Sequence, residues 1–173
     1  MVGTAEPSLL AYYSDEILKE EDLPIRIAGF SQCYRSEIGS YGKDTRGLYR
    51  VHEFMKVEQV VIAAADVAES DKLQKEMTEI TREIHADLGL PFLQIQICTG
   101  DMGGPDARQI DIETWMPGEN KYRETHTSDM MTDYQARRLG TRVRRALGTT
   151  ELVHMNDATV VAVVTLFFYF AVF

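Results

Sequence analysis

CYRSEIGSYGKDTRGLYRVHEFMKVE, residues 33–58, is the stretch that decides the fold. It connects two runs that we interpret as strands, Ile25–Tyr34 and residues 48–65. The segment between them is polar and glycine-containing, which is typical of a loop. The sequence therefore predicts a hairpin with a long loop, and loops beyond about 12 residues are usually functional or disordered.

Charged and aromatic side chains gather on both arms of this hairpin. Arg35 and Glu37 are two residues apart, so on a strand they share one face. On the return strand Phe54 and Glu58 also share a face, with Lys56 between them. A ring, an Arg fork and two carboxylates suit a ligand that has a base, phosphates and an ammonium group. A surface ladder of salt bridges explains the same residues equally well.

The flanking segments predict helices and further strands. Residues 8–22 suit short helical turns that Pro24 ends. Residues 70–88 carry apolar side chains at steps of three or four, with Ser70 as the N-cap and Gly89 after the end. Strands are predicted at residues 92–98, 109–116 and, more briefly, 121–125, and a helix capped by Thr132 or Asp133 is predicted to continue through Arg145.

Helices that bound hairpin-connected strands indicate an α+β fold with a mostly antiparallel sheet. Glycine-rich βαβ turns are absent, which excludes Rossmann and P-loop nucleotide sites. Residues 158–173 are apolar except Thr159 and Thr165. This stretch is shorter than the roughly 20 residues of a membrane-spanning helix, so we expect a buried strand or helix. An exposed, truncated end is the alternative.

The composition limits the kinds of function. The net charge is −9, which argues against indiscriminate nucleic-acid binding but allows a local basic patch. Cys33 and Cys98 each stand alone, so no disulfide framework or cysteine-pair zinc site is expected. The histidines also lack the spacing of zinc ligands. No secretory signal opens the chain, and we expect a cytoplasmic protein that does not enter a membrane.

The hairpin stretch resembles motif 2 of the class II aminoacyl-tRNA synthetases, and in particular of the seryl-tRNA synthetases. GTAE at residues 3–6, CTGDMGGPDARQIDIETWMPGENKYRETHTSDMMTDYQARR at 98–138 and LVHMNDAT at 152–159 resemble that family in the same order. The resemblance implies an antiparallel sheet flanked by helices, with residues 1–173 as one incomplete catalytic domain. It also implies ATP-dependent activation of L-serine and transfer of the seryl group to tRNA-Ser.

The resemblance assigns two groups of ligand residues. The serine residues are Thr4, Ala5, Glu6, Arg35, Glu58 and Thr159, where Arg35 is the catalytic residue and Glu58 takes the serine hydroxyl. The ATP residues are Arg35, Ser36, Glu37, Val51, His52, Glu53, Phe54, Glu124, Thr125, His126 and Thr127.

Within the ATP set, Glu124 and Thr127 are implied to hold Mg²⁺ through oxygen atoms, which this ion prefers. His126 departs from the family, which usually has a small hydroxyl residue there. Without the resemblance, we would expect His126 to be an exposed loop residue.

The tRNA acceptor end is implied to meet Lys43 and Arg46 of the long loop. Arg137 and Arg138 match a family segment near the active site, although an arginine-rich helix is also typical of a solvated face.

Several family parts are missing or altered. From the resemblance we expect the chain to lack the N-terminal arm that grips tRNA-Ser, and to lack motif 1, which forms the homodimer interface of family members. In motif 3, Asp157 replaces an Asn, and Thr165 lies near the place of an expected Arg. A non-catalytic synthetase-like protein that binds serine, ATP or a partner therefore remains an alternative, as does an interaction domain that packs its apolar end into a partner.

Overall fold

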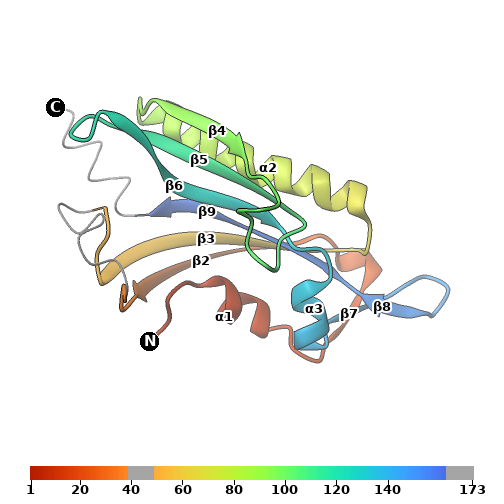
Figure 1. The fold of residues 1–173 in the computed structure, drawn as a ribbon. Coiled ribbons are helices and arrows are strands. Elements are labelled where there is room, and N and C mark those ends of the chain that lie inside the picture. Colours follow the sequence, from red (N-terminus) through yellow and green to blue (C-terminus); the bar gives the residue numbers. More distant parts are fainter. Residues whose placement is uncertain (39–48, 163–173) are drawn as a thin grey trace.

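The computed structural model describes residues 1–38 and 49–162. Its main feature is a six-stranded sheet in the order β2-β3-β9-β6-β5-β4, in which all neighbouring strands are antiparallel (Figure 1). The strands are β2 Ile25–Tyr34, β3 Glu53–Ala63, β4 Phe92–Gln96, β5 Arg108–Met116, β6 Lys121–Met130 and β9 His154–Ala162. Among the described helices, none is long and apolar enough to cross a membrane.

Helices cover both faces of this sheet. The long helix α2, Val67–Asp87, packs on one face against β3, β6 and β9 (Figure 1). The short helices α1, Glu6–Ala11, and α3, Tyr134–Leu139, pack on the other face. A small second sheet and one turn of 3₁₀-helix complete the described part: β1 Ile17–Lys19, η1 Glu20–Asp22, β7 Arg142–Arg144 and β8 Thr150–Leu152.

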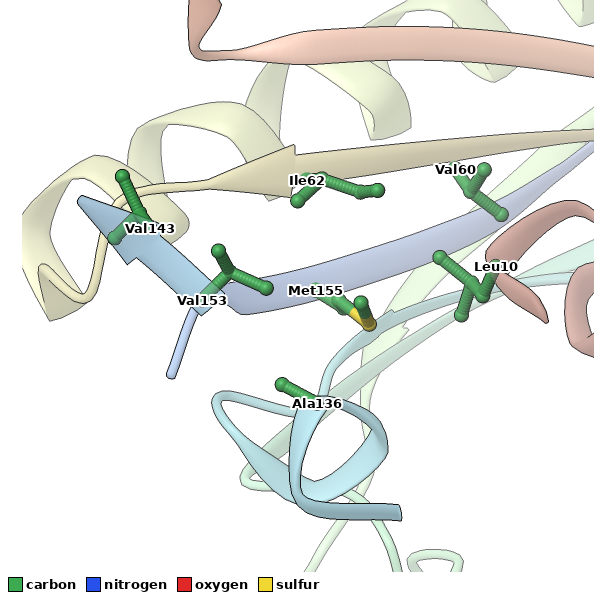
Figure 2. Packing of buried hydrophobic residues seen from close by; sticks show 7 residues of the cluster. All are labelled: Leu10, Val60, Ile62, Ala136, Val143, Val153 and Met155. Carbon is green, nitrogen blue, oxygen red and sulfur yellow. The ribbon is translucent and has the colours of Figure 1, made fainter. Parts of the chain in front are cut away.

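The core has two parts because strand β3 is buried on both faces. Successive side chains of a strand point to opposite faces. Val60 and Ile62 accordingly join the cluster with Leu10 of α1 and Ala136 of α3 (Figure 2). Val61 and Ala63 join Leu73 and Met77 of α2 in the second cluster, together with Ala158 of β9. The antiparallel α+β fold predicted from the sequence is confirmed.

The hairpin of β2 and β3 is confirmed, with corrections at its ends. Strand β2 has the predicted bounds, but β3 begins at Glu53, later than the predicted residue 48. The predicted loop falls largely on residues 39–48, which lie outside the described residues. Arg35 and Glu37 are not on a strand as predicted: β2 ends at Tyr34, and Glu37 adopts a left-handed φ of +51°.

Helix α2 begins earlier than predicted because its cap is Asp66, whose side chain accepts from the backbone N–H of Glu69 at 2.9 Å. Ser70, the predicted cap, lies inside the helix and is fully buried. Its hydroxyl lies 2.9 Å from the Asp66 carbonyl oxygen and 2.9 Å from His154 Nδ1.

The helix predicted to continue through Arg145 is wrong. Helix α3 ends at Leu139, and the following Gly140 has a φ of +71°, which is the left-handed geometry that commonly ends helices. Residues 142–144 then form strand β7, so the arginines at 142, 144 and 145 do not share a helical face with those at 137 and 138.

Two other segments also differ. Strand β6 runs ten residues, past the predicted end at residue 125. Residues 8–22 contain the end of α1, strand β1 and the 3₁₀ turn, so they are only partly helical. Of the apolar stretch, residues 158–162 belong to β9, and residues 163–173 lie outside the described residues.

Candidate active site

A cavity of about 370 Å³ opens beside the end of β2, the start of β3, the middle of β6 and the end of β9. Its size is within the usual range for small-molecule sites. Eleven of its lining residues belong to the sets named from the sequence: Thr4, Glu6, Arg35, Glu37, Val51, Phe54, Glu124, Thr125, His126, Thr127 and Thr159. The other four are Tyr49, Arg50, Lys56 and Ala162. Ala5, Ser36, His52, Glu53 and Glu58 do not line it. Lys43 and Arg46 lie outside the described residues.

The chain's first residues are attached to the end of β2, which brings Thr4 and Glu6 to the cavity. The Tyr34 N–H donates to the Val2 carbonyl at 2.8 Å, and Arg35 Nε donates to the Gly3 carbonyl at 3.2 Å. The Thr4 hydroxyl in turn donates to the Glu6 carboxylate. A hydroxyl and a carboxylate are therefore fixed next to the Arg35 guanidinium.

Arg35 is held in place although it lies beyond the strand. Its backbone N–H donates to the His52 carbonyl at 3.0 Å, which extends the hairpin pairing past β2. Its guanidinium carbon lies 5.1 Å from the centre of the Phe54 ring, within the range of a cation–π contact. The cavity thus presents a positioned cation beside an aromatic face.

A second charged group lies deeper, between α1, β3 and β9. Lys56 Nζ lies 3.2 Å from Glu6 Oε1 and also pairs with the Glu58 carboxylate. Glu58 is fully buried, and the Thr159 hydroxyl donates to its Oε1 at 3.1 Å. Its other oxygen, Oε2, has no hydrogen-bond partner among the described residues. A buried acceptor without a partner is costly, so Glu58 Oε2 retains the capacity to accept one more hydrogen bond.

A β-bulge in β6 brings Glu124 and Thr127 to the cavity together. Ile112 of β5 pairs with His126, whereas the next residue, Glu113, pairs with Glu124, so Thr125 is an extra residue. In a regular strand, residues three apart point to opposite faces. The extra residue removes that difference, and both Glu124 and Thr127 line the cavity.

The electrostatics near Glu124 favour a bound cation. Burial raises the pKa of the Glu124 carboxyl, and the nearby Asp111 and Glu113 raise it further, while Arg35 and Arg50 act in the opposite direction. A carboxylate oxygen and a hydroxyl oxygen are hard ligands, so the Glu124–Thr127 pair fits Mg²⁺. Within residues 1–38 and 49–162, no group of three or more His, Cys, Asp or Glu residues could hold a metal ion. A bound ion would therefore need further oxygens from its ligand.

Two more carboxyl groups lie side by side on β6 and β9. Asp129 and Asp157 are register partners across these strands. Burial, followed by the charge of Glu6, raises the pKa of Asp157 to about 8. Burial and the neighbouring Asp157 raise the pKa of Asp129 to about 8 as well. At neutral pH this pair therefore favours a protonated carboxyl.

Some sequence expectations fail in this region. His126 is buried in β6 rather than exposed in a loop, because it packs against His85 of α2 with ring centres 4.6 Å apart. Arg137 pairs with Asp133, and Arg138 lies over the Tyr134 ring; both are exposed and neither lines the cavity, which agrees with the alternative of a solvated face. Sequence reasoning assigned no role to Lys56. Because residues 54, 56 and 58 of a strand point to the same face, the period of two could have placed Lys56 beside Phe54 and Glu58.

Tyr49 and Arg50 were also missed. The Tyr49 hydroxyl donates to the Glu124 backbone carbonyl at 2.7 Å, and Arg50 pairs with Glu37 at 2.6 Å. Both residues follow the predicted loop, and no period in the sequence connects them with Glu124 or Glu37. Their place in the cavity lining follows only from the tertiary structure, in which residues 49 and 50, just before β3, lie against β6.

Comparison with known proteins places this chain in a family. Residues 1–171 match the family described as the tRNA synthetase class II core domain (G, H, P, S and T). Among curated relatives, the serine–tRNA ligase of Dictyoglomus thermophilum is 44% identical over 163 residues, covering 94% of this chain and 38% of the relative. That of Methanospirillum hungatei is 45% identical over 164 residues, with the same coverage.

Solved structures agree with these relatives. The seryl-tRNA synthetase of Pyrococcus horikoshii complexed with ATP is 40% identical, with a TM-score of 0.89 over 94% of this chain and 36% of that one. The cytoplasmic serine–tRNA ligase of Naegleria fowleri in complex with AMP is 34% identical, with a TM-score of 0.88 over 94% of this chain and 39% of that one. The chain thus spans about two-fifths of the length of the proteins that it matches.

Proposed function

The chain belongs to the class II tRNA synthetase core domain family, and from this premise we propose that it activates L-serine with ATP, forming seryl-adenylate and releasing pyrophosphate. One observation carries the proposal: a single cavity gathers side chains from four distant segments of the chain. These are Thr4 and Glu6, Arg35 and Phe54, Glu124 and Thr127, and Thr159. Together they offer partners for an ammonium group, a phosphate, a base and a hydroxyl.

In this proposal, serine binds above the Glu58–Thr159 pair. Its hydroxyl donates to Glu58 Oε2, the buried oxygen that has no partner among the described residues. Its ammonium group pairs with Glu6, next to the Thr4 hydroxyl. An amino acid without a hydroxyl would leave the Glu58 oxygen unpaired, which is a strong basis for rejecting alanine.

ATP binds in this proposal with its base against Phe54 and its α-phosphate at Arg35. The serine carboxylate oxygen attacks the α-phosphorus, and the bond to the pyrophosphate oxygen breaks. Charge grows on the phosphoryl oxygens during attack, so a positioned guanidinium stabilises the transition state more than the ground state. Glu124 and Thr127 would hold Mg²⁺, which when bound neutralises charge on the phosphates.

Transfer of the seryl group to tRNA-Ser is the second step of the proposal. Its support is the name of the relatives, serine–tRNA ligases, of which this chain spans 38%. The loop residues implied for the tRNA contact, Lys43 and Arg46, lie outside the described residues. Activation is therefore the step that the cavity supports best, and it can be tested without tRNA.

The test is serine-dependent exchange of labelled pyrophosphate into ATP by the full chain. We expect exchange with serine, little with alanine, and at least a tenfold loss in Arg35→Ala. Arg26→Ala is the matched control, because Arg26 pairs with Glu76 on the surface and does not line the cavity. Folded protein that binds ATP without any exchange would instead favour the non-catalytic alternative.

A further inference from the structure

A buried row of polar side chains connects α2 to the strands behind the cavity. Its members are His85 of α2, Thr114 of β5, and Thr125 and His126 of β6. His85 and Thr114 are fully buried, and His126 is 2% exposed. Neither His85 nor Thr114 lines the cavity, and the proposed reaction uses neither of them. Thr125 is half-buried, but the other three polar side chains lie in the core, where they carry a cost unless they are paired, so their arrangement calls for a role.

The contacts form a continuous series. His85 Nδ1 lies 2.8 Å from the Thr81 carbonyl oxygen, and His85 Nε2 lies 3.0 Å from Thr114 Oγ1. Thr114 Oγ1 lies 2.7 Å from Thr125 Oγ1, which lies 2.8 Å from His126 Nδ1. The series therefore ends on the two residues that follow Glu124.

The direction of each hydrogen bond in the row follows from the group at its α2 end, the Thr81 carbonyl. The Thr81 carbonyl can only accept, so His85 Nδ1 donates, and in a neutral imidazole Nε2 then accepts from the Thr114 hydroxyl. That uses the single hydrogen of Thr114, so the Thr125 hydroxyl donates to Thr114. His126 Nδ1 must then donate to Thr125, which leaves His126 Nε2 without a hydrogen.

The geometry agrees with this direction. His126 Nε2 is the ring nitrogen that has no hydrogen-bond partner among the described residues. Burial lowers the pKa of His85, so its ring is neutral. The Thr125 hydroxyl also lies 3.2 Å from the Ile112 carbonyl oxygen, farther than its 2.7 Å distance to Thr114 Oγ1.

The row is attached to the bulge that turns Glu124 toward the cavity. Thr125 is the extra residue of that bulge, and its hydroxyl binds both β5 and the neighbouring His126. If β6 slipped by one residue to remove the bulge, Glu124 would turn to the opposite face and these bonds would be lost. We propose that His85, Thr114, Thr125 and His126 are positioning residues that hold the bulge so that Glu124 and Thr127 face the cavity together.

This inference rests on the proposed function in one respect, since it assigns Glu124 and Thr127 to the Mg²⁺ of Mg·ATP. The test is the affinity of the full chain for ATP, measured by calorimetry with Mg²⁺ and with EDTA. In Thr114→Val, which keeps the shape but removes the hydroxyl, we expect the Mg²⁺-dependent gain in affinity to fall about tenfold. The affinity in EDTA should stay within twofold, and Thr114→Ser should restore the gain.

Thr78→Val is the matched control, because the Thr78 side chain on α2 is also buried but, among the described residues, its hydroxyl donates only to the Gln74 carbonyl. It should leave both affinities unchanged. Should Thr114→Val not fold, His85→Phe makes the same comparison, because it removes the ring nitrogens of a row member that does not line the cavity. If Thr114→Val lost ATP affinity equally with Mg²⁺ and with EDTA, the row would have only a structural role and the inference would be overturned. An ATP affinity of Thr114→Val equal to that of the wild type under both conditions would overturn it as well.

A second readout tests the row without ATP. Nitrogen chemical shifts of the imidazole rings should show His85 and His126 as neutral tautomers protonated at Nδ1, and Thr114→Val should disturb both. Protonation of His126 at Nε2 would overturn the arrangement itself. A wild-type chain with the expected tautomers but no affinity for ATP would overturn the proposed function, and with it the role given to the row.

Discussion

Glu58 is the single residue on which serine selection depends in our proposal. It is fully buried, pairs with Lys56 and accepts from Thr159, yet one of its oxygens has no partner among the described residues. Glu58→Gln keeps the shape but replaces one acceptor with a donor. We expect serine-dependent exchange to fall at least tenfold, while ATP affinity changes less than twofold.

The control for this variant is Glu79→Gln, because Glu79 pairs with Arg82 on the exposed side of α2. Calorimetric titration with ATP and exchange at varied serine concentration give the two quantities. An equal loss of ATP affinity in Glu58→Gln would mean that the whole cavity had been disturbed.

Asp157 gives the protein a pH dependence of stability. Its pKa in the folded state is about 8, above the value of about 3.9 for an unfolded aspartate. Between these values the folded state holds a proton that the unfolded chain has released, so the free energy of unfolding falls as pH rises. Asp157→Asn should remove part of this dependence and stabilise the protein at pH 8 by about 1–3 kcal/mol.

Urea denaturation at pH 5 and pH 8 measures this effect. Asp87→Asn, at the exposed end of α2, is the comparison and should leave the slope with pH unchanged. If Asp157→Asn lost as much stability as the wild type over this range, the raised pKa of Asp157 would not be the cause.

At the scale of elements, α2 is held to the sheet by one buried stripe, which combines the apolar Leu73 and Met77 with hydrogen-bonded polar side chains such as Gln74. Met77 is 2% exposed and packs in the cluster with Val61 and Ala63 of β3, whereas Ile80 on the same helix is 39% exposed. Met77→Ala should lower the free energy of unfolding by about 2–5 kcal/mol because it leaves a cavity. Ile80→Ala should cost less than about 1 kcal/mol, and chemical denaturation compares the two. Similar losses would mean that α2 does not pack through this stripe.

Strand β6 shows how an element can serve the site through an irregularity. Its alternation of inward and outward residues is interrupted at Thr125, and this interruption brings Glu124 and Thr127 to one face. A pattern of residues on a strand assumes a regular period of two, so the sequence alone cannot indicate where such an extra residue lies.

At the scale of the whole molecule, the cavity is formed by segments from both ends of the chain. Ligand binding should therefore stabilise the entire fold, since only the folded chain assembles the site. At 100 times its dissociation constant, Mg·ATP should add about 2.7 kcal/mol and raise the melting temperature by about 5–10 °C. Arg35→Ala should lose most of this shift in thermal unfolding followed by circular dichroism, and Arg26→Ala should keep it. A full shift in Arg35→Ala would place ATP elsewhere.

The sequence by itself determined the family and those local elements that follow a regular period. The alternation over β2, the helical period of α2 and the glycine after it are properties of neighbouring residues, so they could be predicted with errors at the ends alone. The motifs around Arg35, Glu58 and Glu124 carried the resemblance to class II synthetases, which the comparisons confirm.

Only the tertiary structure decided which of these residues meet and which are buried. Lys56 lies between Glu6 and Glu58 because α1 packs on β3, and His126 is buried because α2 covers β6. Helix α3 stops early because residues 142–144 pair with two other strands. Burial, strand register and bulges arise from contacts between segments distant in sequence, and no period within one segment records them.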